Sequence, residues 1–232
     1  MDELLSITSA SVSRFLRRWY GVVDGAGGPQ PATSPHVPGE LIMWHKAADC
    51  VGRPVTFQDR PIALSNLAPD SSGMLEFWVE NQNGYSWAVC LADGRRRVFS
   101  REGGRVDWVE TEEALGDFLL HCTVREALIG SASKFTVFVD SSELDEALES
   151  FERLKFVALD SEEPQVELWC SDNALVRMAP PPMGYSTPGQ QLLMLTFATP
   201  SDSQIERYAS RFNLDMQPEP AHSEPLYEPP PF

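Results

Sequence analysis

The chain has 232 residues, of which 42% are apolar and 10% aromatic, enough for the packed core of one large domain or two small ones. Its 18 basic and 34 acidic residues give a formal net charge of −16, which disfavours direct binding to the phosphate backbone of nucleic acids. No apolar run approaches the roughly 20 residues that cross a bilayer, and the acidic start is unlike a secretory signal, so we expect a cytoplasmic protein.

The first predicted element is an amphipathic helix. Its apolar stripe has helical spacing and contains Val12, Phe15, Leu16, Trp19 and Tyr20. Gly21 ends this helix, and residues 25–35, rich in Gly and Pro, are predicted to form a loop. Pro38 suits the start of a second helix, with Leu41 and Trp44 on its inner face.

The middle of the chain has the pattern of a β-sheet. Residues 53–69 suit irregular chain or an edge strand because they contain three prolines. The aromatic and β-branched runs that follow predict strands at 74–80, 85–91, 96–100 and 106–109. Asn83-Gly84 indicates a hairpin turn, because both residues tolerate positive φ. A helix is expected over residues 115–129, with Glu112 and Glu113 at its N-terminal end.

After Gly130 a new set of patterns begins. Strands are predicted at 135–139 and 192–197, a helix at 142–153, a hairpin from 166–170 and 174–178, and a last helix after Pro200. The charge also changes: residues 1–134 hold 13 basic and 17 acidic residues, a net charge of −4, whereas residues 135–232 hold 5 and 17, a net charge of −12.

These patterns predict an α+β fold in three parts. We expect one domain at residues 1–133, an acidic α+β lobe at 134–216 and a tail at 217–232, where six prolines in sixteen residues favour polyproline II structure or disorder. Four aromatic residues on the inferred inward stripes are expected to share one core: Trp19, Trp44, Trp87 and Phe118.

No catalytic motif is found in the sequence. The four cysteines and four histidines lack the spacing of a metal site or a disulfide framework, and no glycine-rich phosphate loop or nucleophile elbow is present, so we expect no cofactor and no metal. Glu76 and Glu80 are expected on one strand face, with Trp78 on the other. Two solvated glutamates are favoured over an acid–base pair, although an enzyme with dispersed catalytic residues stays an alternative.

An ordered set of short runs carries a resemblance to a known family. The runs are Phe15-Leu16-Arg17-Arg18-Trp19-Tyr20-Gly21, Val37-Pro38-Gly39-Glu40-Leu41, Leu75-Glu76-Phe77-Trp78-Val79-Glu80-Asn81-Gln82, Trp87-Ala88-Val89, Val98-Phe99, Trp108, Leu115-Gly116-Asp117-Phe118-Leu119-Leu120 and Glu126-Ala127. Over residues 9–130 their order and spacing resemble the SUKH superfamily, the Smi/Knr-like proteins of bacterial toxin–immunity systems and fungal cell-wall regulation. The chain departs from that pattern at Asn83-Gly84, where the family often places Gly directly after Gln, and residues 135–232 have no counterpart in it.

The resemblance implies a binding fold in which helices pack on a curved, largely antiparallel sheet, without shared catalytic residues. It favours a non-catalytic protein that occludes a basic, intracellularly acting toxin; a regulatory or scaffold protein without a toxin partner is the alternative. An acidic surface suits such a basic protein partner. The candidate partner-binding residues are Glu76, Glu80, Asn81, Gln82, Asp160, Glu162 and Glu163. Asn81 and Gln82 are also expected to bind backbone groups where the strand ends.

Overall fold

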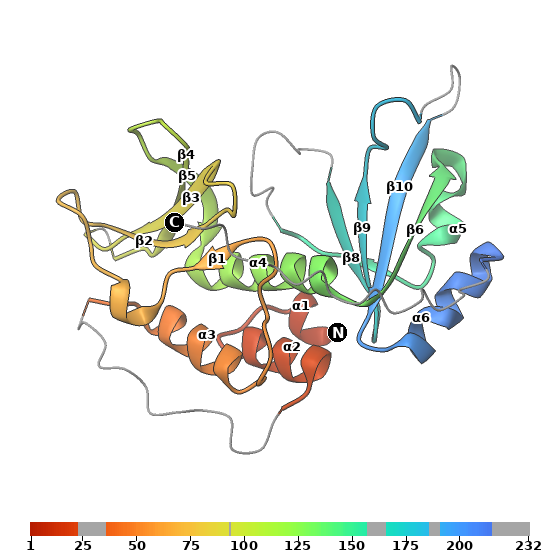
Figure 1. Cartoon of the computed structure of the whole chain (residues 1–232), viewed down its shortest axis with the longest axis horizontal. Helices are drawn as coiled ribbons and strands as arrows, with labels where there is room; N and C mark the ends of the chain where they lie inside the picture. Colours follow the sequence, from red (N-terminus) through yellow and green to blue (C-terminus); the bar gives the residue numbers. More distant parts are fainter. Residues whose placement is uncertain (23–35, 93, 157–165, 186–190, 215–232) are drawn as a thin grey trace, which may run out of the picture.

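The structure of the protein is a computed structural model, which describes residues 1–22, 36–92, 94–156, 166–185 and 191–214. Within these residues the chain is an α+β protein with two five-stranded antiparallel sheets, each with helices packed against it (Figure 1). This confirms the α+β class that the sequence predicted. The predicted loop at 25–35 and the proline-rich tail at 217–232 lie outside the described residues.

The described residues 1–130 form the part that we call the N-lobe. Its helices are α1 (Asp2–Leu5), α2 (Ser11–Tyr20), α3 (Gly39–Asp49) and α4 (Leu115–Gly130), with a 3-10 turn η1 (Leu64–Asn66). Its sheet runs in chain order through β1 (Arg60–Pro61), β2 (Met74–Val79), β3 (Tyr85–Cys90), β4 (Arg97–Glu102) and β5 (Val109–Ala114). The predicted short edge strand within residues 53–69 is therefore confirmed as β1.

The strand predicted at 106–109 is wrong, because β5 begins where that range ends. Val106 is 86% exposed, and the ring of Trp108 lies under the Arg101 guanidinium, whose Cζ is 4.2 Å from the ring centroid. Pairing with β4 starts only at Val109, which lies opposite Ser100. Trp108 thus packs against Arg101 of β4 without joining the sheet.

The described residues 133–214 form the C-lobe. Its elements are β6 (Ser133–Asp140), η2 (Ser141–Glu143), α5 (Leu144–Ala147), β7 (Glu152–Arg153), β8 (Glu167–Cys170), β9 (Leu175–Ala179), β10 (Leu192–Thr199), α6 (Asp202–Ala209) and η3 (Ser210–Phe212). The strand order is β6-β10-β9-β8-β7, so β6 pairs with β10 and with no strand of the first sheet. The predicted hairpin becomes β8 and β9.

The helix predicted over residues 142–153 is wrong for most of its length. Only η2 and the single turn α5 are helical, and the chain is extended again at Glu152, which lies opposite Cys170 of β8. Phe151 and Leu154 are both buried, but in different clusters on different sides of the second sheet. A continuing helix could not place these two side chains so far apart, so tertiary packing overrides the helical periodicity.

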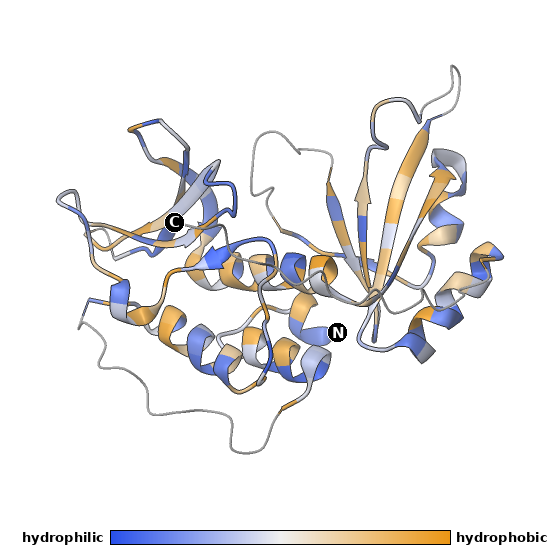
Figure 2. Cartoon of the chain, in the orientation of Figure 1, coloured by the Kyte–Doolittle hydropathy of each residue, from blue (hydrophilic) through white to orange (hydrophobic). Residues whose placement is uncertain are grey.

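Helix α4 contributes buried residues to the cores of both lobes. Its apolar residues are orange in Figure 2. Phe118 and Leu119 pack against the first sheet, whereas Leu120 and Val124 pack in a second cluster with Leu168 of β8. The cluster between the lobes contains residues from α1, α2, α4 and the second sheet. The two sheets are separate, yet the lobes share this core, and the domain boundary at residue 133 stays a prediction.

The aromatic residues assigned to the core are all buried, as predicted, but they do not share one cluster. Trp44, Trp87 and Phe118 belong to the cluster under the first sheet. Trp19 instead packs between the lobes, with Phe15 at a ring-centroid distance of 5.8 Å. The apolar stripe of α2 is thus wide enough to face both cores at once.

Candidate partner-binding surfaces

Glu76 lies on the face of the first sheet opposite α4, where it is paired with a cation. A β-bulge between Glu76 and Trp78 places them opposite Ala88 and Trp87 respectively, so their side chains face different sides, as expected. Glu76 Oε2 accepts a hydrogen bond from Arg101 Nη2 at 2.9 Å. Its charge is therefore largely compensated within the protein, which makes it a weaker attractor for a basic partner.

The predicted placement of Glu80 on the same strand face is wrong, because β2 ends at Val79 and Glu80 lies in the hairpin. Its Oε2 accepts from the Gly84 backbone N–H at 2.8 Å, and Asn83 takes a positive φ of 59°. Asn81 and Gln82 are exposed at the tip. The hairpin is confirmed, but the glutamate, rather than the two amides, binds the backbone of the turn.

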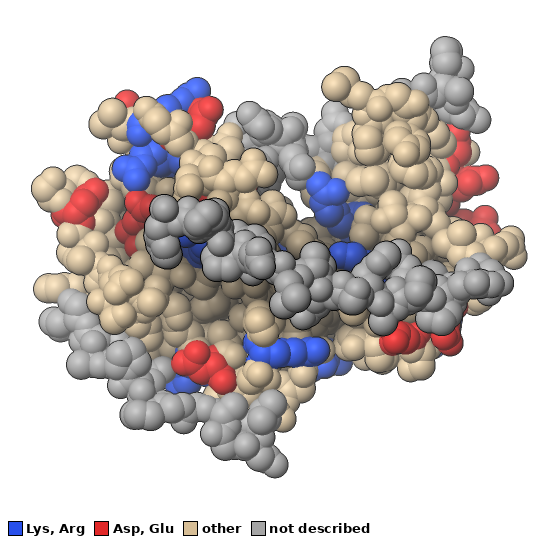
Figure 3. All heavy atoms as spheres, viewed as in Figure 1, with Lys and Arg blue, Asp and Glu red and all other residues tan. Residues whose placement is uncertain are grey.

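Three of the predicted site residues, Asp160, Glu162 and Glu163, lie outside the described residues. A further set of acidic residues precedes them in the sequence and lies within the described part of the C-lobe. We define the acidic surface as Asp140, Glu143, Asp145, Glu146, Glu149 and Glu152, all of which are exposed except the half-buried Asp140. Figure 3 shows acidic side chains along the outer margin of the C-lobe.

Hydrogen bonds fix the backbone that carries the acidic surface at two points. Asp140 Oδ1 accepts from the backbone N–H of Ser142 at 3.0 Å and from its hydroxyl at 2.7 Å, and these hydrogen bonds lower the pKa of Asp140. Arg211 Nη2 donates to the carbonyl of Glu146 at 3.2 Å, which fixes the end of α5. Among the described residues, no Lys or Arg forms an ion pair with any of these six carboxylates.

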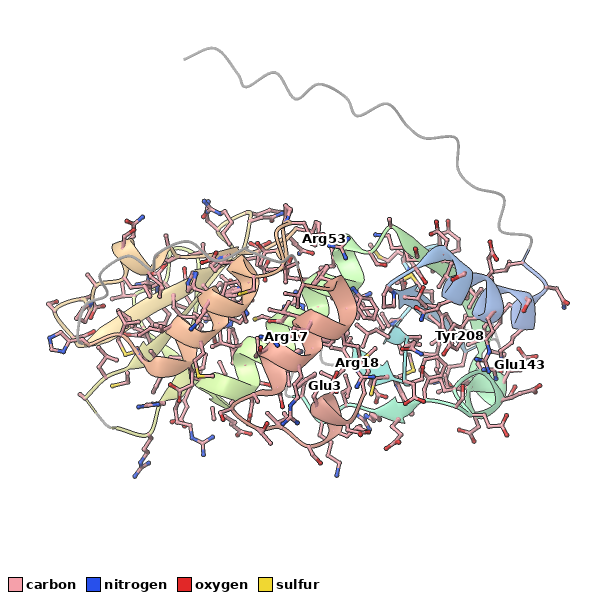
Figure 4. All side chains as sticks on the ribbon, turned by 90° about the horizontal axis from the view of Figure 1, so that it is seen from below. Glu3, Arg17, Arg18, Arg53, Glu143 and Tyr208 are labelled. Carbon is pink, nitrogen blue, oxygen red and sulfur yellow. The ribbon has the colours of Figure 1, made fainter. Side chains whose placement is uncertain are left out.

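A basic surface lies on the other lobe. Helix α2 exposes Arg14, Arg17 and Arg18 and contains no acidic residue. Arg18 is paired with Glu3 of α1, with Nε 2.9 Å from Oε1. In Figure 4, Arg17 and Arg18 lie on α2 whereas Glu143 lies at the far end of the C-lobe. The exposed arginines of α2 and the acidic surface therefore lie on different lobes.

A buried polar cluster at the junction of the lobes was not predicted. The Nδ1–H of His121 on α4 donates to Glu113 Oε1 of β5 at 3.1 Å, and both side chains are less than 10% exposed. Phe156 of the C-lobe stacks on the imidazole with a centroid distance of 4.5 Å. Burial lowers the pKa of His121 although its hydrogen bond to Glu113 opposes this shift, so the ring is neutral at pH 7. Glu113 lies at the N-terminal end of α4, as expected, and it also accepts a hydrogen bond from a side chain of that helix.

The described residues contain no group of three or more His, Cys, Asp or Glu side chains placed to hold a metal ion. The four cysteines are unpaired thiols, and burial raises the pKa of Cys170 to about 11. In the described parts of the chain, no helix combines the length and apolar character needed to cross a membrane.

Comparisons with protein families, with curated proteins and with solved structures find no match for this chain. The resemblance to the SUKH superfamily therefore rests on the sequence runs alone.

Sequence reasoning missed Asp145, Glu146 and Glu149 as site residues, because it treated them as the solvated face of a longer helix. The signal was present in the sequence: from Asp140 to Glu152 the chain has six acidic residues and no Lys or Arg. What could not be seen was that the helix is only one turn long. The carboxylates therefore follow the chain from one edge strand of the second sheet, β6, past α5 to the other edge strand, β7.

Proposed function

We propose that this chain is a non-catalytic protein-binding module that receives a basic protein on its acidic surface. Its activity would be occlusion, as in the SUKH immunity proteins that its N-lobe resembles. The observation that carries the proposal is a segment, residues 140–152, that has six carboxylates and no Lys or Arg of its own, and in which none of the carboxylates forms an ion pair with a described Lys or Arg.

The physical argument starts from the rate of encounter. Opposite charges raise association rates, and this effect weakens with salt because the Debye length falls from about 10 Å at 0.1 M to about 3 Å at 1 M ionic strength. Glu76 and Glu102 on the N-lobe are partly compensated by Arg101 and Arg105. The uncompensated carboxylates of the C-lobe therefore supply the stronger attraction for a cationic partner.

Apolar anchors are also required, since charges at the rim of an interface mainly change the association rate. Phe138, two residues before Asp140, is 40% exposed and stacks on Tyr185, which is 58% exposed, with a centroid distance of 4.9 Å. Phe138 thus lies close in sequence to the start of the acidic surface, and Tyr185 stacks on it. They are the natural anchors for a partner that is first attracted by charge.

The test is the association rate as a function of ionic strength. The partner is first identified by copurification with the full chain from the cells that encode it, then purified for stopped-flow measurements. A variant with Glu143, Asp145, Glu146 and Glu149 each replaced by Gln should associate more slowly at low salt and show a shallower salt dependence. The control variant neutralises four exposed acids of the N-lobe: Asp2, Asp49, Asp107 and Glu112. Equal salt slopes for the wild type and the C-lobe variant would show that the acidic surface serves solubility alone.

A growth assay distinguishes an occluding protein from a scaffold. If the partner is a toxin, its expression arrests growth, and coexpression of the chain restores it, less effectively with the C-lobe variant. A partner that is harmless without the chain would favour the regulatory or scaffold function.

A further inference from the structure

The C-lobe presents one long edge strand. Strand β6 lies at the margin of the second sheet, and all eight of its residues are in register with β10 (Figure 1). On its other side, no described segment forms backbone hydrogen bonds with it. The remaining edges are blunted: β1 and β7 have two residues each, and β5 is disrupted by an irregular register and by a positive φ at Glu112. A long, regular edge strand exposes unpaired backbone N–H and C=O groups, which can pair with a strand of another chain.

The register identifies which backbone groups point outward. The Ser141 N–H donates to the Gln191 carbonyl at 2.9 Å, which continues the register of the β6–β10 ladder. Because hydrogen-bonded pairs alternate along an antiparallel ladder, Phe135, Val137 and Val139 bond to β10. The N–H and C=O groups of the alternate residues therefore point to the open edge. These residues are Lys134, Thr136, Phe138 and Asp140.

We propose that β6 pairs with β6 of a second copy of this chain, antiparallel about a two-fold axis at Val137. In this register Lys134 lies opposite Asp140 of the second copy, and Thr136 lies opposite its Phe138. On the other face, Phe135 lies opposite Val139. The outward backbone groups of each copy then meet those of the other, and the two second sheets become one continuous sheet.

Charge complementarity selects this register. With the axis at Val137, both ends of the ladder carry a Lys–Asp pair. A shift of the axis to Thr136 places Lys134 opposite Phe138 and leaves Asp140 without an opposite residue in the strand. Asp140 is held as an anion by its hydrogen bonds from Ser142, and opposite charges directly across a strand pair stabilise it. The interface is isologous, which is the arrangement of most homodimers.

Charge reversal provides a test that discriminates between registers. The wild-type full chain should sediment as a dimer in analytical ultracentrifugation. Lys134→Glu and Asp140→Lys each place like charges at both ends, so each variant alone should raise the dimer dissociation constant by about tenfold or more. An equimolar mixture should restore dimers, because in the heterodimer the introduced glutamate faces the introduced lysine and the native pair is intact at the other end. Lys155→Glu, the same change of charge outside β6, should leave the dimer unaffected.

A backbone variant tests the strand pairing itself. Thr136→Pro removes an N–H that points outward and keeps the backbone hydrogen bonds to β10, although it loses the hydrogen bond between the Thr136 and Thr196 hydroxyls at 3.0 Å. It should therefore abolish the dimer while circular dichroism stays close to wild type and the melting temperature falls only slightly. A monomeric wild type throughout the concentration range would overturn the proposal and leave the edge to an extended peptide of a partner. A dimer that tolerates Lys134→Glu, Asp140→Lys and Thr136→Pro would overturn it as well, since its interface would lie elsewhere.

Discussion

Trp44 of α3 donates its indole N–H to the hydroxyl oxygen of Thr123 on α4 at 2.9 Å, and both side chains are buried. The Thr123 hydroxyl in turn donates to the Leu119 carbonyl one turn earlier at 2.6 Å. The Thr123 hydroxyl thus accepts a hydrogen bond from α3 and donates one within its own helix, α4. It gives the two helices a specific relative position that apolar packing alone would not define.

Thr123→Val should destabilise the protein by about 1–3 kcal/mol, because it leaves the buried Trp44 N–H without an acceptor at nearly unchanged side-chain volume. Urea unfolding monitored by tryptophan fluorescence measures the change. Thr123→Ser keeps the hydroxyl and is the matched control. An equally large loss in the serine variant would assign the effect to the missing methyl group instead.

The burial of Trp44 could be predicted from the sequence, but its partner could not. Helical spacing places Trp44 on an inner face, since periodicity reports which side of a helix is apolar. The hydrogen bond joins residues 79 positions apart in the sequence. Such a contact depends on how α3 and α4 are placed by the sheet, which no local pattern encodes.

Trp87→Ala should destabilise the fold by about 3–5 kcal/mol, as large-to-small changes in a packed core do. The side chain is 1% exposed, and its ring lies 5.7 Å from that of Phe118 and 6.2 Å from that of Tyr85. Trp108→Ala, at a half-buried site beside Arg101 of β4, is the control and should cost less. Denaturant unfolding of both variants gives the comparison, and equal losses would contradict the assignment of Trp87 to the core.

Glu126 on α4 is a second buried group with a defined structural function. Its Oε2 accepts from the backbone N–H groups of Phe57 and Gln58, the latter at 2.9 Å, and its Oε1 accepts from that of Asp59 at 2.9 Å. The irregular chain predicted for residues 53–69 is thus tied to α4 by one carboxylate. This satisfies backbone donors that a regular strand would have paired.

Glu126→Gln should destabilise the protein by about 1–3 kcal/mol, because the amide offers one acceptor oxygen in place of two and brings N–H groups toward backbone donors. Hydrogen exchange of the Phe57, Gln58 and Asp59 amides should accelerate together, which distinguishes a released loop from a general loss of stability. Glu112→Gln on the exposed part of β5 is the control. Unchanged protection of the three amides would contradict this function of Glu126.

The sequence predicted the class of fold, the hairpins and most strand positions, because period-two and helical patterns are local properties. It failed at residues 142–153, where Phe151 and Leu154 are drawn into different clusters, and at Glu80, whose carboxylate binds the turn. For the candidate site, the sign of the charge on the C-lobe followed from composition. The positions of the individual carboxylates did not, since they depend on where tertiary packing ends the helix.

The junction of the lobes should make stability depend on pH in a particular direction. Burial lowers the pKa of His121 from its ordinary value of 6.5, and Arg125 also disfavours the charged ring, whereas Glu113 opposes the shift. The unfolded chain therefore binds the proton more tightly than the folded chain does. The stability contributed by the neutral ring is complete above pH 6.5 and is lost as the pH falls below that value through the folded pKa.

His121→Gln should remove this part of the pH dependence while keeping a side chain that can donate to Glu113. The free energy of unfolding in urea is measured for both proteins from about pH 8 to about pH 5, a window above the ordinary carboxyl range. The wild type should lose more stability than the variant as the pH falls. The pKa of His45 is also lowered by burial, so part of the slope persists in the variant, and only the difference between the two proteins reports His121. Parallel curves would mean that the imidazole accepts its proton in the folded protein without cost, which its burial between Glu113 and Phe156 does not allow.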